Sequence, residues 1–91
     1  MSNMWTIKLS KQAASFIKDY GGKQARLFEA AFEQLSTDPY SGKSLVGELK
    51  GYWSYRIGQF RIIYSIRKTE IIIEALRVQH RREVYEKLKR I

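Results

Sequence analysis

Apolar and polar residues alternate along residues 4–9, where Trp5, Ile7 and Leu9 would face one side and the residues between them the other. A period of two is the pattern of a β-strand. The sequence therefore predicts a short strand with one buried face. After Leu9 the spacing changes to three and four, which predicts a helix whose N-cap is Ser10.

Two helices are predicted between this strand and residue 36. The apolar positions of the first are Leu9, Ala13, Phe16, Ile17 and Tyr20. Gly21 and Gly22 are expected to end it, because glycine adopts the left-handed conformation of a helix stop. The apolar stripe of the second, residues 23–36, consists of Leu27, Phe28, Ala31, Phe32 and Leu35. The pair is predicted to form an antiparallel hairpin.

The second half of the chain returns to a period of two. Strands are predicted over residues 52–57, 60–66 and 70–78, with a tight turn at Gly58 and Gln59. Residues 45–49 are predicted to form a turn that packs two leucines, and residues 80–91 a short C-terminal helix. The expected fold is a single α+β domain over residues 1–91, in which the helix hairpin covers one face of an antiparallel strand meander.

Charge is distributed unevenly along the chain. The net charge is +8, and residues 50–91 hold eleven Lys and Arg against four acidic residues. A basic surface of this density is typical of proteins that bind nucleic acid or an acidic partner, although many small basic proteins bind neither. Arginines that alternate with apolar strand residues are expected to gather on the sheet face that the helices leave open.

Other classes of protein are not favoured. The chain has no cysteine, a single histidine and no clustered carboxylates, so neither a disulfide, a metal site nor a cofactor is expected. The N-terminal residues do not have the pattern of a signal peptide, and no apolar run approaches the length of a membrane span. We expect a cytoplasmic protein that does not contact membranes.

The arginine face suggests metal-independent RNA cleavage. In that reaction the 2′-hydroxyl attacks the adjacent phosphate, so the site needs a base, an acid and positive charge around the phosphorus. Arg61 and Arg56 are suited to hold the phosphate, whereas His80 and Tyr85 are side chains that can move a proton. Each also has a structural interpretation: the arginines as solvated surface residues, His80 as a partner of backbone groups, and Tyr85 as a cover for the edge of the core.

Three segments make the sequence recognisable. Glu48-Leu-Lys-Gly51, Tyr55-Arg-Ile-Gly-Gln-Phe-Arg-Ile-Ile-Tyr64 and His80-Arg-Arg-Glu-Val-Tyr85 occur in the same order as in the RelE/ParE superfamily of toxin–antitoxin toxins, which the chain resembles over nearly its whole length. The resemblance implies a microbial RNase fold of the RelE type. It also implies a growth-inhibiting toxin that a RelB-like, acidic antitoxin neutralises.

Within the superfamily the resemblance favours the RelE branch, whose members cleave mRNA in the ribosomal A site without a metal. It implies that Arg61 and Arg81 stabilise the scissile phosphate and that Tyr85 orients or deprotonates the attacking group. Arg56 falls where well-studied members place lysines that transfer protons, and this chain has no lysine in that strand. The other cationic side chains expected to bind RNA or phosphate are Lys50, His80, Arg77 and Arg82.

The expected function is therefore that of a type II toxin, a ribosome-dependent mRNA endonuclease or mRNA interferase. Its expected partners are the cognate antitoxin, the ribosome and mRNA, with operator DNA bound only through the antitoxin complex. Two alternatives stay open. One is a ParE-like protein that inhibits DNA gyrase without cleaving nucleic acid, and the other is an inactive relative that only binds RNA or an antitoxin.

Overall fold

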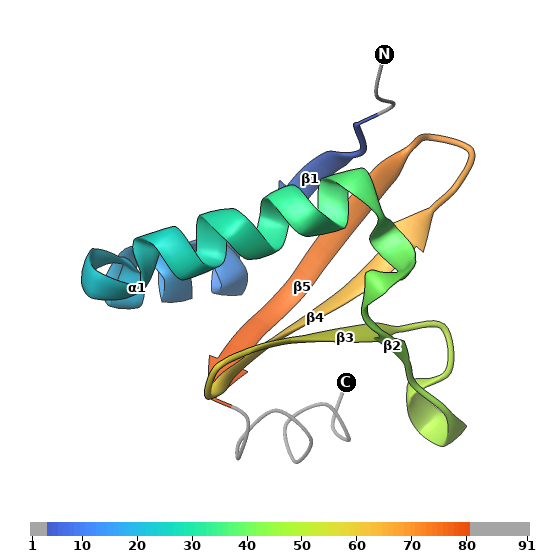
Figure 1. Ribbon diagram of the computed structural model, residues 1–91. Coiled ribbons are helices and arrows are strands. Elements are labelled where there is room, and N and C mark those ends of the chain that lie inside the picture. Colours follow the sequence, from blue (N-terminus) through green and yellow to red (C-terminus); the bar gives the residue numbers. More distant parts are fainter. Residues whose placement is uncertain (1–3, 81–91) are drawn as a thin grey trace.

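The computed structural model describes residues 4–80, except for the side chains of residues 20, 21 and 23. A five-stranded sheet forms its centre, with the strand order β1-β5-β4-β3-β2. The strands are β1 (Thr6–Leu9), β2 (Lys43–Ser44), β3 (Trp53–Ile57), β4 (Phe60–Arg67) and β5 (Ile72–His80). The one long helix, α1 (Lys11–Thr37), lies against one face of the sheet (Figure 1). No helix in this part of the chain is long and apolar enough to span a membrane.

The predicted meander is confirmed. β3 pairs antiparallel with β4, and β4 with β5, whereas β1 lies parallel to the other edge of β5. β5 lies between β1 and β4, and it begins later and ends later than expected. Ile71 precedes the strand with a φ of 57° and is 47% exposed, and the strand continues through His80. The remainder of the predicted C-terminal helix lies outside the described residues.

α1 contains the predicted helix hairpin within one numbered element. A straight helix of 27 residues would be about 40 Å long. The Trp5 backbone N–H nevertheless donates to the Ser36 carbonyl at 2.8 Å. Trp5 is only five positions before the N-cap Ser10, a distance of about 17 Å at most in extended chain. The helical chain must therefore double back, and Figure 1 shows a blue arm beside a turquoise-to-green arm.

The glycine pair in α1 does not act as predicted. Helical backbone continues through Gly21 and Gly22, and Gly22 is not among the glycines with positive φ. The prediction of a left-handed stop is wrong for Gly22, and the glycine pair does not end the helical backbone. The N-cap prediction is confirmed, because the Ser10 side chain accepts a hydrogen bond from the Ala13 backbone N–H at 3.0 Å.

The main core lies between α1 and the sheet. Its buried members are Ala13, Phe28, Ala31, Leu35, Ile57, Ile62, Tyr64, Ile73, Ala75 and Val78. The aromatic rings of Phe16 and Phe28, one from each arm of α1, each lie 5.7 Å from the Phe60 ring. The helical stripe is narrower than predicted, because Leu27 is 48% exposed, and Leu9 of β1 is also exposed.

A second, smaller core lies on the opposite face of the sheet. Ile63 of β4 is fully buried there beneath Leu45, Leu49 and Tyr52. The predicted turn that packs two leucines is thus confirmed, and it contains the short 3-10 helix Gly47–Leu49. Leu45, Leu49 and Tyr52 thus cover part of the sheet face opposite α1. The neighbouring part carries the charged residues described next.

Candidate functional site

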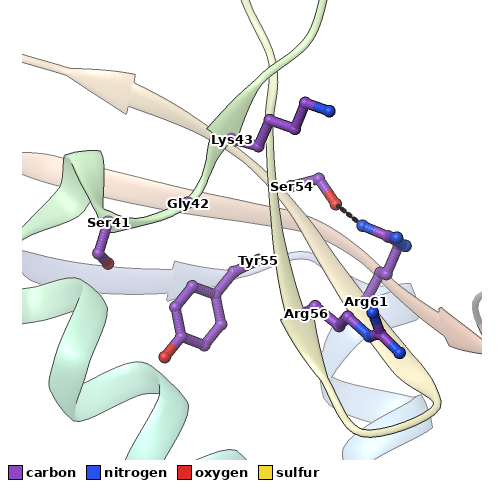
Figure 2. A pocket seen from close by; sticks show the side chains of 7 residues that line it. All are labelled: Ser41, Gly42, Lys43, Ser54, Tyr55, Arg56 and Arg61. Carbon is purple, nitrogen blue, oxygen red and sulfur yellow. Dashed lines mark hydrogen bonds between the residues drawn. The ribbon is translucent and has the colours of Figure 1, made fainter.

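Strand alternation places three polar side chains on the face opposite α1. Ser54 and Arg56 of β3 alternate with the core residues Trp53, Tyr55 and Ile57, so they point away from the helix. Arg61 lies directly across from Arg56 in the register of β3 and β4. Figure 2 shows these side chains on one side of β3, with Tyr55 on the other.

A groove of about 400 Å³ lies at this edge of the sheet. It is lined by Ser41, Gly42, Lys43, Ser54, Tyr55, Arg56 and Arg61. In the described residues β2 pairs only with Trp53 and Ser54, which leaves the edge of β3 uncovered from Tyr55 onward. The groove is therefore bounded by the two-residue strand β2 and by three cationic side chains.

Arg61 is the best-positioned cation of the groove. Its guanidinium Nη1 donates a hydrogen bond of 3.1 Å to Ser54 Oγ, and Ser54 is only 3% exposed. Because a buried hydroxyl restricts the guanidinium, the Arg61 side chain is held in place before any ligand arrives. Arg56, by contrast, is exposed, and within residues 4–80 its hydrogen bond is a long one of 3.4 Å from Nε to the Gly58 carbonyl.

Two arginines placed directly across a strand pair repel each other, which costs stability. Arg67, farther along β4, shows the usual way to balance such charge: it donates to Glu74 at 2.8 Å and lies 3.4 Å from Glu70. These carboxylates raise the pKa of Arg67. Lys43 and Arg56 form no ion pair within the described residues. Their positive charge is thus available to an anion.

Gly42 and Tyr64 fix the wall of the groove beside Lys43. The Tyr64 hydroxyl is fully buried and donates to the Pro39 carbonyl at 2.7 Å. Burial raises the pKa of Tyr64 to about 12. A Cβ on Gly42 would collide with this hydroxyl and would lie 2.8 Å from the Ser54 carbonyl oxygen. Only glycine therefore fits at position 42 without displacing its neighbours.

The other predicted site residues are not all brought together. Arg77 pairs with Ile63 and lies on the groove face, diagonally across from Arg61. Lys50 follows the 3-10 helix of the leucine turn and does not line the groove.

His80 lies on the opposite, helix side of the sheet, where it pairs with Phe60. Its Nε2 lies 3.1 Å from Gln59 Oε1, and its ring lies 6.0 Å from the Phe60 ring. Arg81, Arg82 and Tyr85 lie outside the described residues.

Sequence reasoning missed Lys43, Ser54 and Gly42 as parts of the site. Lys43 follows a Pro-containing loop that gives no strand pattern, and two residues are too few for a periodicity to appear. Ser54 lies within the strand predicted over residues 52–57, but nothing in the sequence indicates its bond to Arg61. No group of three potential metal ligands occurs within residues 4–80.

Comparison with known proteins identifies the family. A family model described as the ParE toxin of the type II toxin–antitoxin system parDE matches residues 7–85. The chain belongs to the RelE/ParE superfamily of type II toxins. Toxin RelG of Mycobacterium tuberculosis is 39% identical over 64 residues, which are 69% of this chain and 74% of that toxin.

Solved structures agree with this RelE/ParE assignment. The RelBE2 toxin–antitoxin complex of Mycobacterium tuberculosis contains a chain that is 32% identical, with a TM-score of 0.75 over 86% of this chain and 92% of that one. A variant of the free RelE toxin of Escherichia coli matches with a TM-score of 0.74 over 97% of this chain and 98% of that one. At 14% identity the latter shows the fold alone.

Proposed function

We propose that this RelE/ParE toxin is a metal-independent endoribonuclease that cleaves mRNA in the A site of the ribosome. The observation that carries the proposal is the groove, in which Arg61 is fixed by Ser54 beside Arg56 and Lys43. A fixed guanidinium binds phosphate oxygens with two parallel hydrogen bonds, and the added cations favour the extra negative charge of the transition state. The proposed active unit is a single domain over residues 1–91.

In this proposal the ribosome holds the RNA in the orientation that cleavage requires. Cleavage requires the 2′-oxygen, the phosphorus and the departing 5′-oxygen to lie nearly in line, and free RNA rarely holds this geometry. A message held in the A site is already oriented, and orientation alone can contribute several kcal/mol to the lowering of a barrier. In this scheme Arg61 and Arg81 bind the phosphate and Tyr85 orients or deprotonates the 2′-hydroxyl, as the family resemblance implies.

The proposed partner that restrains the toxin is an acidic, RelB-like antitoxin. The related RelBE2 structure is a toxin–antitoxin complex. This chain has a net charge of +8 and a second groove of about 370 Å³ beside α1, lined by Gln24, Leu27, Ile57, Gly58, Gln59 and Phe60. An antitoxin that places acidic residues on the arginine face and an apolar segment in this second groove would cover both. Operator DNA would be bound through the antitoxin.

Primer extension on a defined message tests the proposal. The purified toxin is added to ribosomes stalled on that message and, in parallel, to the free message. We expect new 5′ ends only in the A-site codon of the ribosome-bound message. Cuts in the free message at the same rate would contradict the dependence on the ribosome, and no cuts in either would contradict the endonuclease.

The matched family model names ParE, and this favours a second candidate function, the inhibition of DNA gyrase. A gyrase inhibitor would stop supercoiling of a relaxed plasmid by purified gyrase and would leave ribosome-bound message intact. The same protein preparation is therefore tested in both assays. Inhibition of gyrase without mRNA cuts would replace the endonuclease proposal. Binding of RNA or antitoxin with neither effect would indicate an inactive relative.

A further inference from the structure

We propose that Lys43 is the general acid of the site and protonates the 5′-oxygen that leaves when the RNA is cut. The proposal rests on the endoribonuclease function above. Lys43 is one of the seven residues that line the groove. It forms the short strand β2 with Ser44 and lies directly across from Ser54, the residue that holds Arg61.

The chemistry of the lining residues singles out this lysine. A departing alkoxide is a strong base, so its departure is faster when a proton is delivered in the transition state. A guanidinium does not give up a proton in proteins, so the arginines of the groove cannot fill that role. Ser54 Oγ accepts the hydrogen bond of Arg61, and Tyr55 lies on the other side of β3, packed against the core. A lysine ammonium carries three protons that it can donate.

The register places Lys43 within reach of a phosphate bound by Arg61. Lys43 pairs directly with Ser54, and the Cβ atoms of such a pair in antiparallel strands lie about 5 Å apart. Arg61 lies diagonally across from Ser54 and reaches its Oγ through Nη1 at 3.1 Å. Figure 2 shows Lys43, Ser54 and Arg61 on the same side of β3. Lys43 is exposed and forms no ion pair among residues 4–80, so its four-carbon stem can move toward the groove.

The position of Lys43 is also fixed at its base. The preceding residue, Gly42, packs against the Tyr64 hydroxyl and the Ser54 carbonyl so closely that no Cβ fits. The backbone of β2 is therefore held against β3 although it pairs through only two residues. This arrangement fixes where the lysine stem starts and leaves only its end mobile.

The proposed step balances as follows. The 2′-oxygen forms a bond to phosphorus and its proton passes to Tyr85, which acts as the base in its deprotonated, phenolate form. The bond from phosphorus to the 5′-oxygen breaks, and this oxygen takes a proton from the Lys43 ammonium. The products are a 2′,3′-cyclic phosphate and a 5′-hydroxyl. Lys43 is left as a neutral amine and regains its proton from water, while Tyr85 loses its proton to water.

A sulfur leaving group tests this role directly. A message is prepared in which the 5′-oxygen at the scissile A-site position is replaced by sulfur, and single-turnover cleavage is measured on the ribosome. A thiolate leaves without protonation because thiols are far more acidic than alcohols. We expect Lys43→Ala to slow cleavage of the oxygen message by about 10²- to 10⁴-fold. On the sulfur message the variant should cleave within about tenfold of the wild-type rate.

Two further variants separate proton donation from charge. Lys43→Arg keeps the positive charge but has no proton that it can transfer to the leaving oxygen. It should therefore cleave the oxygen message as slowly as Lys43→Ala does, and the sulfur message should restore its rate to the same extent. Lys18→Ala removes an exposed lysine of α1, which covers the other face of the sheet, and should match the wild type on both messages. Thermal melting of each variant checks that the fold is retained.

The outcomes that overturn the inference are distinct from those that overturn the endonuclease. Full activity of Lys43→Arg, or equal losses on both messages, would show that Lys43 contributes charge alone. Wild-type rates for Lys43→Ala on the oxygen message would remove it from the site and leave the endonuclease intact. A wild-type toxin that cuts neither message would overturn the proposed function and the acid together.

Discussion

Arg56 and Arg61 face each other directly across β3 and β4, and both line the groove. Like charges in this position are unfavourable in the absence of a ligand, and a phosphate bound between them would relieve the repulsion. The two residues also differ in how firmly they are held. Arg61 is fixed by buried Ser54, whereas Arg56 is exposed. We therefore assign the binding of the scissile phosphate mainly to Arg61.

Replacing Arg56 should make the protein more stable and less active. We expect Arg56→Gln to raise the free energy of unfolding by about 0.2–1 kcal/mol at low salt, because it removes one of two opposed charges. The same change should slow cleavage of ribosome-bound message by about 10²-fold. Urea unfolding and single-turnover cleavage measure the two effects. Arg26→Gln, an exposed change on α1, is the matched control and should alter neither. A loss of stability in Arg56→Gln would contradict the repulsion.

Tyr64 should make the protein sensitive to alkaline pH. Burial raises its pKa to about 12 in the folded protein, from about 10 in the unfolded chain. Between these values the unfolded chain has lost the phenolic proton and the folded protein has kept it. The contribution of Tyr64 is therefore complete below pH 10 and is lost as the pH rises to 12, at about 1.4 kcal/mol per pH unit.

Comparison with Tyr64→Phe isolates this effect. At pH 8 the variant should be less stable by about 1 kcal/mol, because it lacks the hydrogen bond to the Pro39 carbonyl. The difference should shrink above pH 10 and reverse near pH 11, since phenylalanine does not ionise. Urea unfolding at each pH measures it. A constant difference from pH 8 to pH 12 would show that the buried hydroxyl does not titrate in this way.

At the scale of elements, the sequence predicted the features that depend on neighbouring residues, such as strands and helix caps. The alternation of apolar and polar residues predicted the antiparallel strands β3 and β4, and Ser10 was recognised as a helix cap. The glycine pair of α1 is a case in which a local sequence rule, that glycine ends a helix, gave a wrong prediction. Glycine permits a left-handed stop but does not require one, and here contacts of both helical arms with Phe60 accompany the change of direction.

Gly42 beside the groove and Gly22 in α1 give a matched pair of substitutions that test the packing around each glycine. Gly42→Ala should destabilise the protein by about 1–3 kcal/mol, because the new Cβ collides with Tyr64 and the Ser54 carbonyl. Gly22→Ala should be neutral or stabilising by up to about 1 kcal/mol, because Gly22 is helical and has nothing within 4 Å of its Cβ position. Thermal and urea unfolding compare them. A larger loss at Gly22 than at Gly42 would contradict both assignments.

At the scale of the whole molecule, the sequence could not predict which distant segments meet. β1 pairs parallel with β5 across more than sixty residues, and β2 brings Lys43 beside Ser54. Such pairings depend on how the whole sheet assembles and leave no local periodicity. The charge excess of residues 50–91 correctly located the arginine face. The third cation of the groove comes from the nearly neutral half of the chain, so composition alone could not have found it.

The central claim is that the groove cleaves mRNA held by the ribosome. The most direct test maps 5′ ends on ribosome-bound message with the wild-type toxin and with Arg61→Ala, after melting curves show that both are folded. We predict new ends in the A-site codon with the wild type and a loss of at least about 10²-fold with Arg61→Ala. Equal cutting by both proteins would contradict the role of the groove. No cutting by a folded wild-type toxin that still arrests growth would contradict the endonuclease itself.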